Sequence, residues 1–118
     1  MAQSLKVVVF GGSGFLGSHV ADALTAEAYE VVIYDAKQSP YLKMGQKMAV
    51  GDILDESAVG NVVKGAHVVY NFAGISDIAE ASRRPLDSIK LNILGNSIIL
   101  EACRKAGVRR FVFASSLY

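Results

Sequence analysis

Residues 5–35 read LKVVVFGGSGFLGSHVADALTAEAYEVVIYD, and the fold depends on this stretch. An apolar run at 5–10 leads directly into a turn with four glycines, Gly11, Gly12, Gly14 and Gly17. The turn opens a segment that we expect to be helical to about residue 27. A second apolar run at 30–34 ends in Asp35. The order predicts a strand, a glycine turn, a helix and a second strand.

The glycines and the acid have a common physical explanation. Gly11 permits a tight exit from the strand, and Gly17 lets the helix lie close to that strand. Gly14 leaves the surface bare where a pyrophosphate can approach the N–H groups and the positive dipole end of the helix. Asp35 stands where a carboxylate accepts hydrogen bonds from the adenosine ribose and repels a 2′-phosphate. We expect a dinucleotide site that prefers NAD to NADP, rather than a glycine-rich turn that binds nothing.

Composition limits the remaining function classes. The 118 residues suffice for one domain, and 52% are apolar while only 19% are charged. Such a surface suggests contact with another chain or with a missing segment. A net charge of +1 argues against nucleic acid and anionic membranes as partners. One cysteine, no room for a leader before the first strand and no apolar run of about 20 residues lead us to expect a cytoplasmic protein.

The rest of the chain alternates between apolar runs and helical patterns. We expect a loop at 36–47, a strand at 48–50, a helix at 54–64 with Gly65 as C-cap, a buried strand at 67–72, a loop at 75–84, a long helix from Pro85 to about residue 106 with Gly107 as its cap, and a last strand at 110–115.

This alternation predicts an α/β fold, a Rossmann-like doubly wound parallel sheet of about five strands with helices on both faces. Ligands of such sheets bind at the carboxyl ends of the strands. Five segments should therefore form one cleft: 11–17, residue 35, 52–53, 72–74 and 115–116.

Six motifs in this order resemble a known family. They are GGSGFLGS, the terminal Asp35, GDILD, NFAG, PLDSIKLNILGNSIILEACRKAGVRR and FVFASS. The series is similar to the extended short-chain dehydrogenase/reductases, in particular the NAD-dependent nucleotide-sugar epimerases and dehydratases. The resemblance covers nearly the whole chain.

The resemblance implies a role for each matching residue. Gly11, Gly14 and Gly17 would form the phosphate turn, with the N–H groups of Phe15 and Leu16 on the pyrophosphate. Asp35 would hold the ribose, while Asp52 and Ile53 would contact the adenine. Phe72, Ala73 and Gly74 would run beneath the cofactor, with Gly74 leaving room for it, and Asn92 would lie near the nicotinamide. Ser115 would border the cofactor, and Ser116 would be catalytic, because its hydroxyl would hydrogen-bond the reacting oxygen of the substrate.

The sequence departs from the family at its acid/base pair, a tyrosine with a lysine four residues later. None of Tyr29, Tyr34, Tyr41 and Tyr70 has that lysine, and Tyr118 is the last residue. We therefore expect residues 1–118 to be a single NAD(P)-binding domain, truncated before the pair and the sugar-binding part, and inactive alone.

Several simpler interpretations stay open at this stage. Asp52 could merely cap the helix that follows, although Asp55 competes for that position. Ser115 and Ser116 could be loop hydroxyls without a chemical role. Cys103 is expected in the core, although neighbouring cations could lower its pKa. His19 and His67 have no partner at metal-ligand spacing, so no metal is expected.

Several functions remain open. The one that we favour is an enzyme that epimerises or dehydrates a nucleotide sugar with bound NAD. The alternatives are a dinucleotide-sensing module without turnover, or a related NAD(P)-dependent reductase of the hydroxysteroid-dehydrogenase type. Apolar residues extend around more of the 85–106 helix than one sheet can cover, so we also expect a homodimer through this helix.

Overall fold

The structure is a computed structural model that describes residues 4–116. Its centre is one parallel sheet with the strand order β3-β2-β1-β4-β5. The strands are β1 (Lys6–Phe10), β2 (Glu30–Asp35), β3 (Gln46–Val50), β4 (Ala66–Asn71) and β5 (Arg110–Phe113). The predicted Rossmann-like doubly wound sheet is confirmed. The strand order reverses at β1, so the switch point of the sheet lies between β1 and β4.

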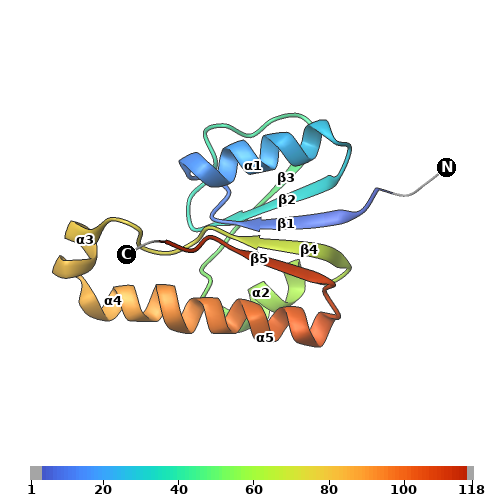
Figure 1. The fold of residues 1–118 in the computed structure, drawn as a ribbon. Coiled ribbons are helices and arrows are strands. Elements are labelled where there is room, and N and C mark those ends of the chain that lie inside the picture. The colour runs from blue at the N-terminus through green and yellow to red at the C-terminus, as the bar shows by residue number, and fades with distance from the viewer. Residues whose placement is uncertain (1–3, 117–118) are drawn as a thin grey trace.

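Helices cover both faces of the sheet (Figure 1). Helix α1 (Phe15–Ala26) lies on one face, and α2 (Glu56–Val62) and α5 (Asn96–Ala106) lie on the other. The alternating side chains of β1 supply both cores. Val9 packs with Ala21 of α1, and Val8 packs with Val59 of α2 and Ile99 of α5. These buried aliphatic layers fix the carboxyl ends of the strands at one edge.

Between residues 75 and 107 the chain is more helical than predicted. Residues 75–84 were expected to be a loop, but they contain α3 (Ile78–Arg83), whose first turn is capped by Asp77. The long helix then begins with Pro85 and ends at Gly107 as expected, in the left-handed conformation with φ of 71°. It consists of α4 (Pro85–Ile89), a π-helical segment η1 (Lys90–Gly95) and α5.

Other boundaries shift by a few residues. Helix α2 begins at Glu56, because the side chain of Asp55 accepts a hydrogen bond from the Ala58 N–H, and it ends with Val63 rather than Gly65 as C-cap. The last strand ends at Phe113, so residues 114–116 form a loop. Within residues 4–116, no helix is long and apolar enough to cross a membrane.

Candidate functional site

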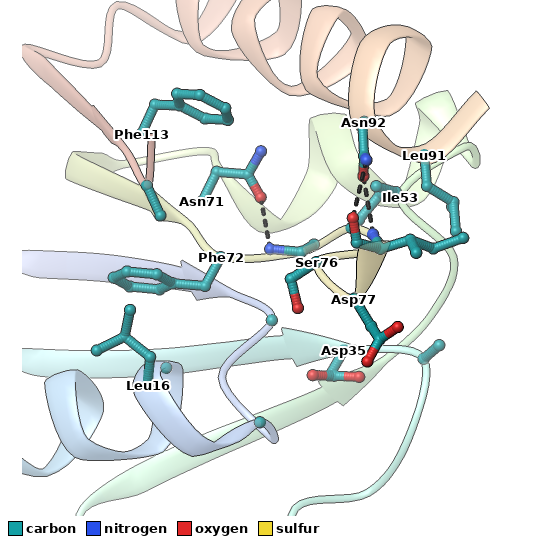
Figure 2. Close-up of a pocket in the computed structure, with 18 of the residues that line it drawn as sticks. Leu16, Asp35, Ile53, Asn71, Phe72, Ser76, Asp77, Leu91, Asn92 and Phe113 are labelled. Atoms are coloured by element: carbon teal, nitrogen blue, oxygen red, sulfur yellow. Dashed lines mark hydrogen bonds between the residues drawn. The ribbon is translucent and has the colours of Figure 1, made fainter. Parts of the chain in front are cut away.

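A cavity of about 1010 Å³ opens at the carboxyl ends of the five strands. The loops after all five strands line it, together with α3 and η1. The structure brings every predicted site residue to this cavity: Gly11, Gly14, Phe15, Leu16, Gly17, Asp35, Asp52, Ile53, Phe72, Ala73, Gly74, Asn92, Ser115 and Ser116. Figure 2 shows part of this lining, with Asp35 and Asn92 contributed by distant parts of the chain. The contacts of these residues with a ligand remain predictions.

The glycines of the first turn have different structural reasons. Gly11 has a φ of +78°, and a Cβ on it would lie 2.6 Å from the Ala73 nitrogen. A Cβ on Gly17 would overlap the Gly11 carbonyl oxygen, so this glycine lets the helix approach the turn rather than the strand. A Cβ on Gly14 would meet only the Gly11 oxygen, at 3.5 Å. Contacts within the protein therefore do not exclude a side chain at position 14.

Gly14 is also the N-cap of α1 and provides no capping side chain. The first N–H groups of the helix, those of Phe15 and Leu16 among them, have no acceptor within the helix. The Phe15 side chain is 80% exposed and the Leu16 side chain 55%, so both project from the cavity wall. The helix start therefore presents backbone donors to the cavity beside Gly14, which has no side chain, and such an arrangement suits an anion.

Asp35 ends β2 and is fixed by the glycine turn. Its Oδ2 accepts a hydrogen bond from the Ser13 N–H at 3.0 Å, and its Oδ1 accepts one from the Lys37 N–H at 3.1 Å. The Ser13 hydroxyl donates to the Lys37 carbonyl oxygen at 2.7 Å. Sequence reasoning found Asp35 but missed Ser13, whose only signal is a hydroxyl residue between two glycines of the turn.

The end of β3 is tied to β2 through Tyr34. The Tyr34 hydroxyl donates to the Asp52 carbonyl oxygen at 2.8 Å, and burial raises the pKa of this tyrosine. The Asp52 side chain accepts from the Leu54 N–H at 2.9 Å, while Asp55 caps α2, so the helix-cap interpretation of Asp52 is wrong. Ile53 is only 6% exposed and fills the space that Gly95 leaves by lacking a side chain.

Asn92 of η1 fixes the loop after β4. Its Oδ1 accepts from the Ile75 N–H at 2.8 Å, and its Nδ2 donates to the Ile75 carbonyl oxygen at 2.9 Å, as the dashed lines in Figure 2 show. Gly74, with a φ of +137°, has no Cβ that would overlap the Asn92 amide. Gly74 was expected to make room for a cofactor, and the structure adds that it makes room for Asn92.

Asn71 is a further site residue that sequence reasoning missed. It is 1% exposed at the end of β4, where its Nδ2 donates to Asn96 Oδ1 at 2.8 Å and its Oδ1 accepts from the Ala73 N–H at 2.9 Å. It thereby joins β4, the loop under the cavity and α5. The available signal was an amide residue inside an otherwise apolar strand, where an unpaired polar group would be costly.

The charged lining is acidic. Asp35, Asp52 and Asp77 line the cavity, and no lysine, arginine or histidine does so among the described residues. The other reactive group that was considered, Cys103, lies in the core, where burial raises its pKa to about 11. The neighbouring cations do not activate this thiol, so it is no candidate nucleophile.

Comparison with known proteins identifies the family. A family model described as "NAD dependent epimerase/dehydratase family" matches residues 7–118. The UDP-glucose 4-epimerase of Erwinia amylovora is 32% identical over 124 residues, which covers 95% of this chain and 37% of that protein. A UDP-glucose 4-epimerase of Klebsiella pneumoniae is 34% identical, with 95% of this chain and 89% of that sequence covered.

Solved structures agree with the sequence relatives. The UDP-glucose 4-epimerase of Thermotoga maritima with UDP-glucose has a TM-score of 0.90 and 30% identity, covering 95% of this chain and 38% of that one. The Brucella ovis enzyme in complex with NAD has a TM-score of 0.88 and 30% identity, covering 97% and 36%. The chain spans little more than a third of the length of the Erwinia, Thermotoga and Brucella proteins. It belongs to the NAD-dependent epimerase/dehydratase family.

Proposed function

We propose that this chain binds NAD in the cavity at the carboxyl edge of its sheet, as the dinucleotide-binding part of an enzyme that epimerises or dehydrates a nucleotide sugar. The observation that carries the proposal is that Gly14 and Asp35 line the same cavity. A Cβ on Gly14 would meet no protein atom closer than 3.5 Å, so the cavity beside this glycine is open to a ligand. The residues present fit a dinucleotide.

Each part of the cavity suits one part of the ligand. The N–H groups at the start of α1 would bind the pyrophosphate. Asp35 would accept hydrogen bonds from the adenosine ribose, and Asp52 and Ile53 would border the adenine. The segment 72–74 would form the floor beneath the dinucleotide; Asn71 holds it at Ala73, and Asn92 holds the next residue, Ile75.

When bound, NAD supplies a hydride acceptor and donor for a carbon of the sugar. The part of this chain in that chemistry would be to position the dinucleotide and the reacting oxygen of the sugar. Ser116, at the edge of the cavity, would hydrogen-bond the reacting oxygen of the sugar, with Ser115 beside it. A tyrosine followed four residues later by a lysine is lacking in residues 1–118. We therefore expect no turnover of UDP- or dTDP-hexoses by this chain alone, and measured turnover would contradict this expectation.

Titration of NAD and NADP into the wild-type chain tests the binding step. NAD should bind more tightly, because Asp35 places a carboxylate beside a 2′-phosphate. Asp35→Ala should weaken NAD binding and narrow the difference between the affinities for NAD and NADP. Glu56→Ala removes a carboxylate outside the cavity lining, so it should change neither the NAD affinity nor that difference. Equal affinities for the two dinucleotides in the wild type would contradict the assignment of Asp35, and no binding of either would contradict the function.

We also propose that the chain forms a homodimer through the long helix. Leu86, Ile93 and Leu100 repeat at helical spacing and are 71%, 62% and 43% exposed. An isologous contact would bury this stripe. Sedimentation of wild type and Ile93→Glu should show loss of the dimer in the variant, and a monomeric wild type would contradict the proposal. Ile98→Glu is a poorer test, because Ile98 packs against the core.

A cytoplasmic location is also a proposal. It is supported by the single cysteine, which is free and buried, as suits a reducing compartment. Fractionation of cells that express the natural protein would test it.

A further inference from the structure

The hydrogen bonds around Asp35 form a closed ring of three residues. Ser13 donates its N–H to Asp35 Oδ2 at 3.0 Å, Lys37 donates its N–H to Asp35 Oδ1 at 3.1 Å, and the Ser13 hydroxyl donates to the Lys37 carbonyl oxygen at 2.7 Å. Ser13 lies in the glycine turn, whereas Asp35 ends β2 and Lys37 follows it, more than twenty positions later. The ring therefore joins the two halves of the proposed dinucleotide site.

Ser13 has a special place in this ring. Its backbone N–H and its hydroxyl both donate, so one residue holds the Asp35 carboxylate and the backbone that follows it. The Lys37 side chain takes no part in the ring, which uses only the backbone of that residue. The hydroxyl of Ser13 is thus the one side-chain donor in the ring, and substitution of Ser13 can remove it.

The ring borders two cavities, and Asp35 lines both of them. The second cavity, of about 670 Å³, is lined by the glycine turn and the segment after β2, including Ser13, Asp35, Lys37 and Tyr41. It shares Gly14, Phe15, Asp35 and Ala36 with the large cavity. Space beside Asp35 is therefore available for the 2′-phosphate of NADP, so steric exclusion does not explain a preference for NAD. The preference depends on the position of the Asp35 carboxylate, which repels that phosphate.

We propose that Ser13 is a positioning residue that sets the dinucleotide selectivity of the site, because its hydroxyl holds the 35–37 segment with the Asp35 carboxylate at the ribose position. This inference rests on the proposed NAD binding. Without the hydroxyl, the backbone of residues 36–38 can move outward, the carboxylate can withdraw, and the ammonium group of Lys37 can approach a phosphate in the second cavity. The preference for NAD then falls.

The test compares Ser13→Ala, which removes the hydroxyl, with Ser13→Thr, which keeps it. The dissociation constants of NAD and NADP are measured by calorimetry for wild type and both variants. We expect Ser13→Ala to lower the NADP-to-NAD ratio of dissociation constants by about fivefold, the change that one neutral hydrogen bond can produce. Ser13→Thr should keep the ratio within about twofold of the wild-type value, because threonine retains the hydroxyl donor.

Amide hydrogen exchange gives a readout that needs no ligand. The Lys37 N–H should exchange faster in Ser13→Ala than in wild type or Ser13→Thr, because its acceptor is no longer held in place. Unchanged exchange at Lys37 would overturn the ring as a positioning device.

The outcomes separate this inference from the proposed function. If the wild type binds NAD but Ser13→Ala lowers only the melting temperature and leaves the selectivity ratio unchanged, Ser13 is a structural turn residue and the inference is overturned. A variant Ser13→Thr that behaves like Ser13→Ala would also overturn it. If the wild type binds neither dinucleotide, the proposed function itself fails.

Discussion

Gly14 and Gly17 stand three residues apart at the start of α1, and the structure predicts that alanine affects stability at Gly17 but hardly at Gly14. In Gly17→Ala the new Cβ would overlap the Gly11 carbonyl oxygen and lie 2.9 Å from the Gly12 Cα. These are backbone atoms, which cannot swing aside as a side chain can. Overpacking costs about 1–3 kcal/mol. Overlap with backbone atoms that cannot move aside places Gly17→Ala in the upper part of that range, at about 2–3 kcal/mol. Alanine in a helix returns at most about 1 kcal/mol.

The net loss for Gly17→Ala is therefore about 1–2 kcal/mol in the free energy of unfolding. A chain of 118 residues has an unfolding entropy of about 0.25 kcal/mol/K, so the melting temperature should fall by about 4–8 °C. NAD binding should weaken together with the stability, because the turn that carries the site is displaced.

Gly14→Ala should leave the stability nearly unchanged. The φ of Gly14 is −82°, which alanine adopts readily, and the Cβ would lie in ordinary contact at 3.5 Å from one oxygen. Alanine is a poorer N-cap than glycine, which lowers the free energy of unfolding. Alanine also reduces the entropy of the unfolded chain, which raises the free energy of unfolding by a similar amount. The added methyl group would stand in the path of the pyrophosphate, so NAD affinity should fall by at least about tenfold, equivalent to about 1.4 kcal/mol.

Thermal unfolding followed by circular dichroism and NAD titration by calorimetry test both variants. Gly60→Ala is the matched control, because a Cβ there meets nothing within 4 Å and Gly60 lies inside α2, away from the cavity lining. It should raise the melting temperature slightly and leave NAD binding unchanged. Equal losses of stability in Gly14→Ala and Gly17→Ala, or unchanged NAD binding in Gly14→Ala, would refute the reasoning.

Three further predictions follow from single groups. Tyr34→Phe removes the donor to the Asp52 carbonyl oxygen and should lower the free energy of unfolding in urea by about 0.5–1.5 kcal/mol, whereas no change would mean that water replaces the hydroxyl. The folded-state pKa of Cys103 is raised to about 11 from 9.0, so the unfolded chain loses the thiol proton first. The ionisation of Cys103 should lower stability by about 2 kcal/mol as the pH rises from 9 to 11, and Cys103→Ala should lack this part of the fall in urea titrations at both pH values. Asp77→Asn keeps an amide oxygen to cap α3 but removes one cavity charge. It should tighten NAD binding by about two- to threefold at low salt and less at high salt, and an equal gain at both salt concentrations would contradict an electrostatic cause.

Much of the fold could be predicted because its signals are local. The apolar run of β1, the glycine turn and Asp35 determine the first strand, helix and strand with little dependence on the rest of the chain. Helix α3 was missed because residues 75–84 are short, polar and without an apolar period. A local signal was nevertheless present, since Asp77 caps the helix and Glu80 stands three residues later, as in a capping box.

The π-helical segment was beyond prediction for a different reason. A change from α to π hydrogen bonding over six residues hardly alters the apolar pattern from which helices are predicted. The contacts of this segment are tertiary. A Cβ on Gly95 would lie 2.9 Å from Ile53 Cγ1, and the Asn92 side chain is hydrogen-bonded to the backbone of Ile75. Nothing in the sequence near residues 90–95 indicates that these partners lie opposite.

The sequence motifs also combine two kinds of constraint that only the structure separates. At Gly11, Gly17 and Gly74 a side chain would meet protein atoms, so these glycines are required by the packing of the turn and by Asn92 even without a ligand. At Gly14 a side chain would meet none closer than 3.5 Å. A motif match at Gly11, Gly17 and Gly74 therefore indicates the fold, whereas a match at Gly14 indicates dinucleotide binding. Gly14 and Asp35 therefore support dinucleotide binding much more than the number of glycines in the turn does.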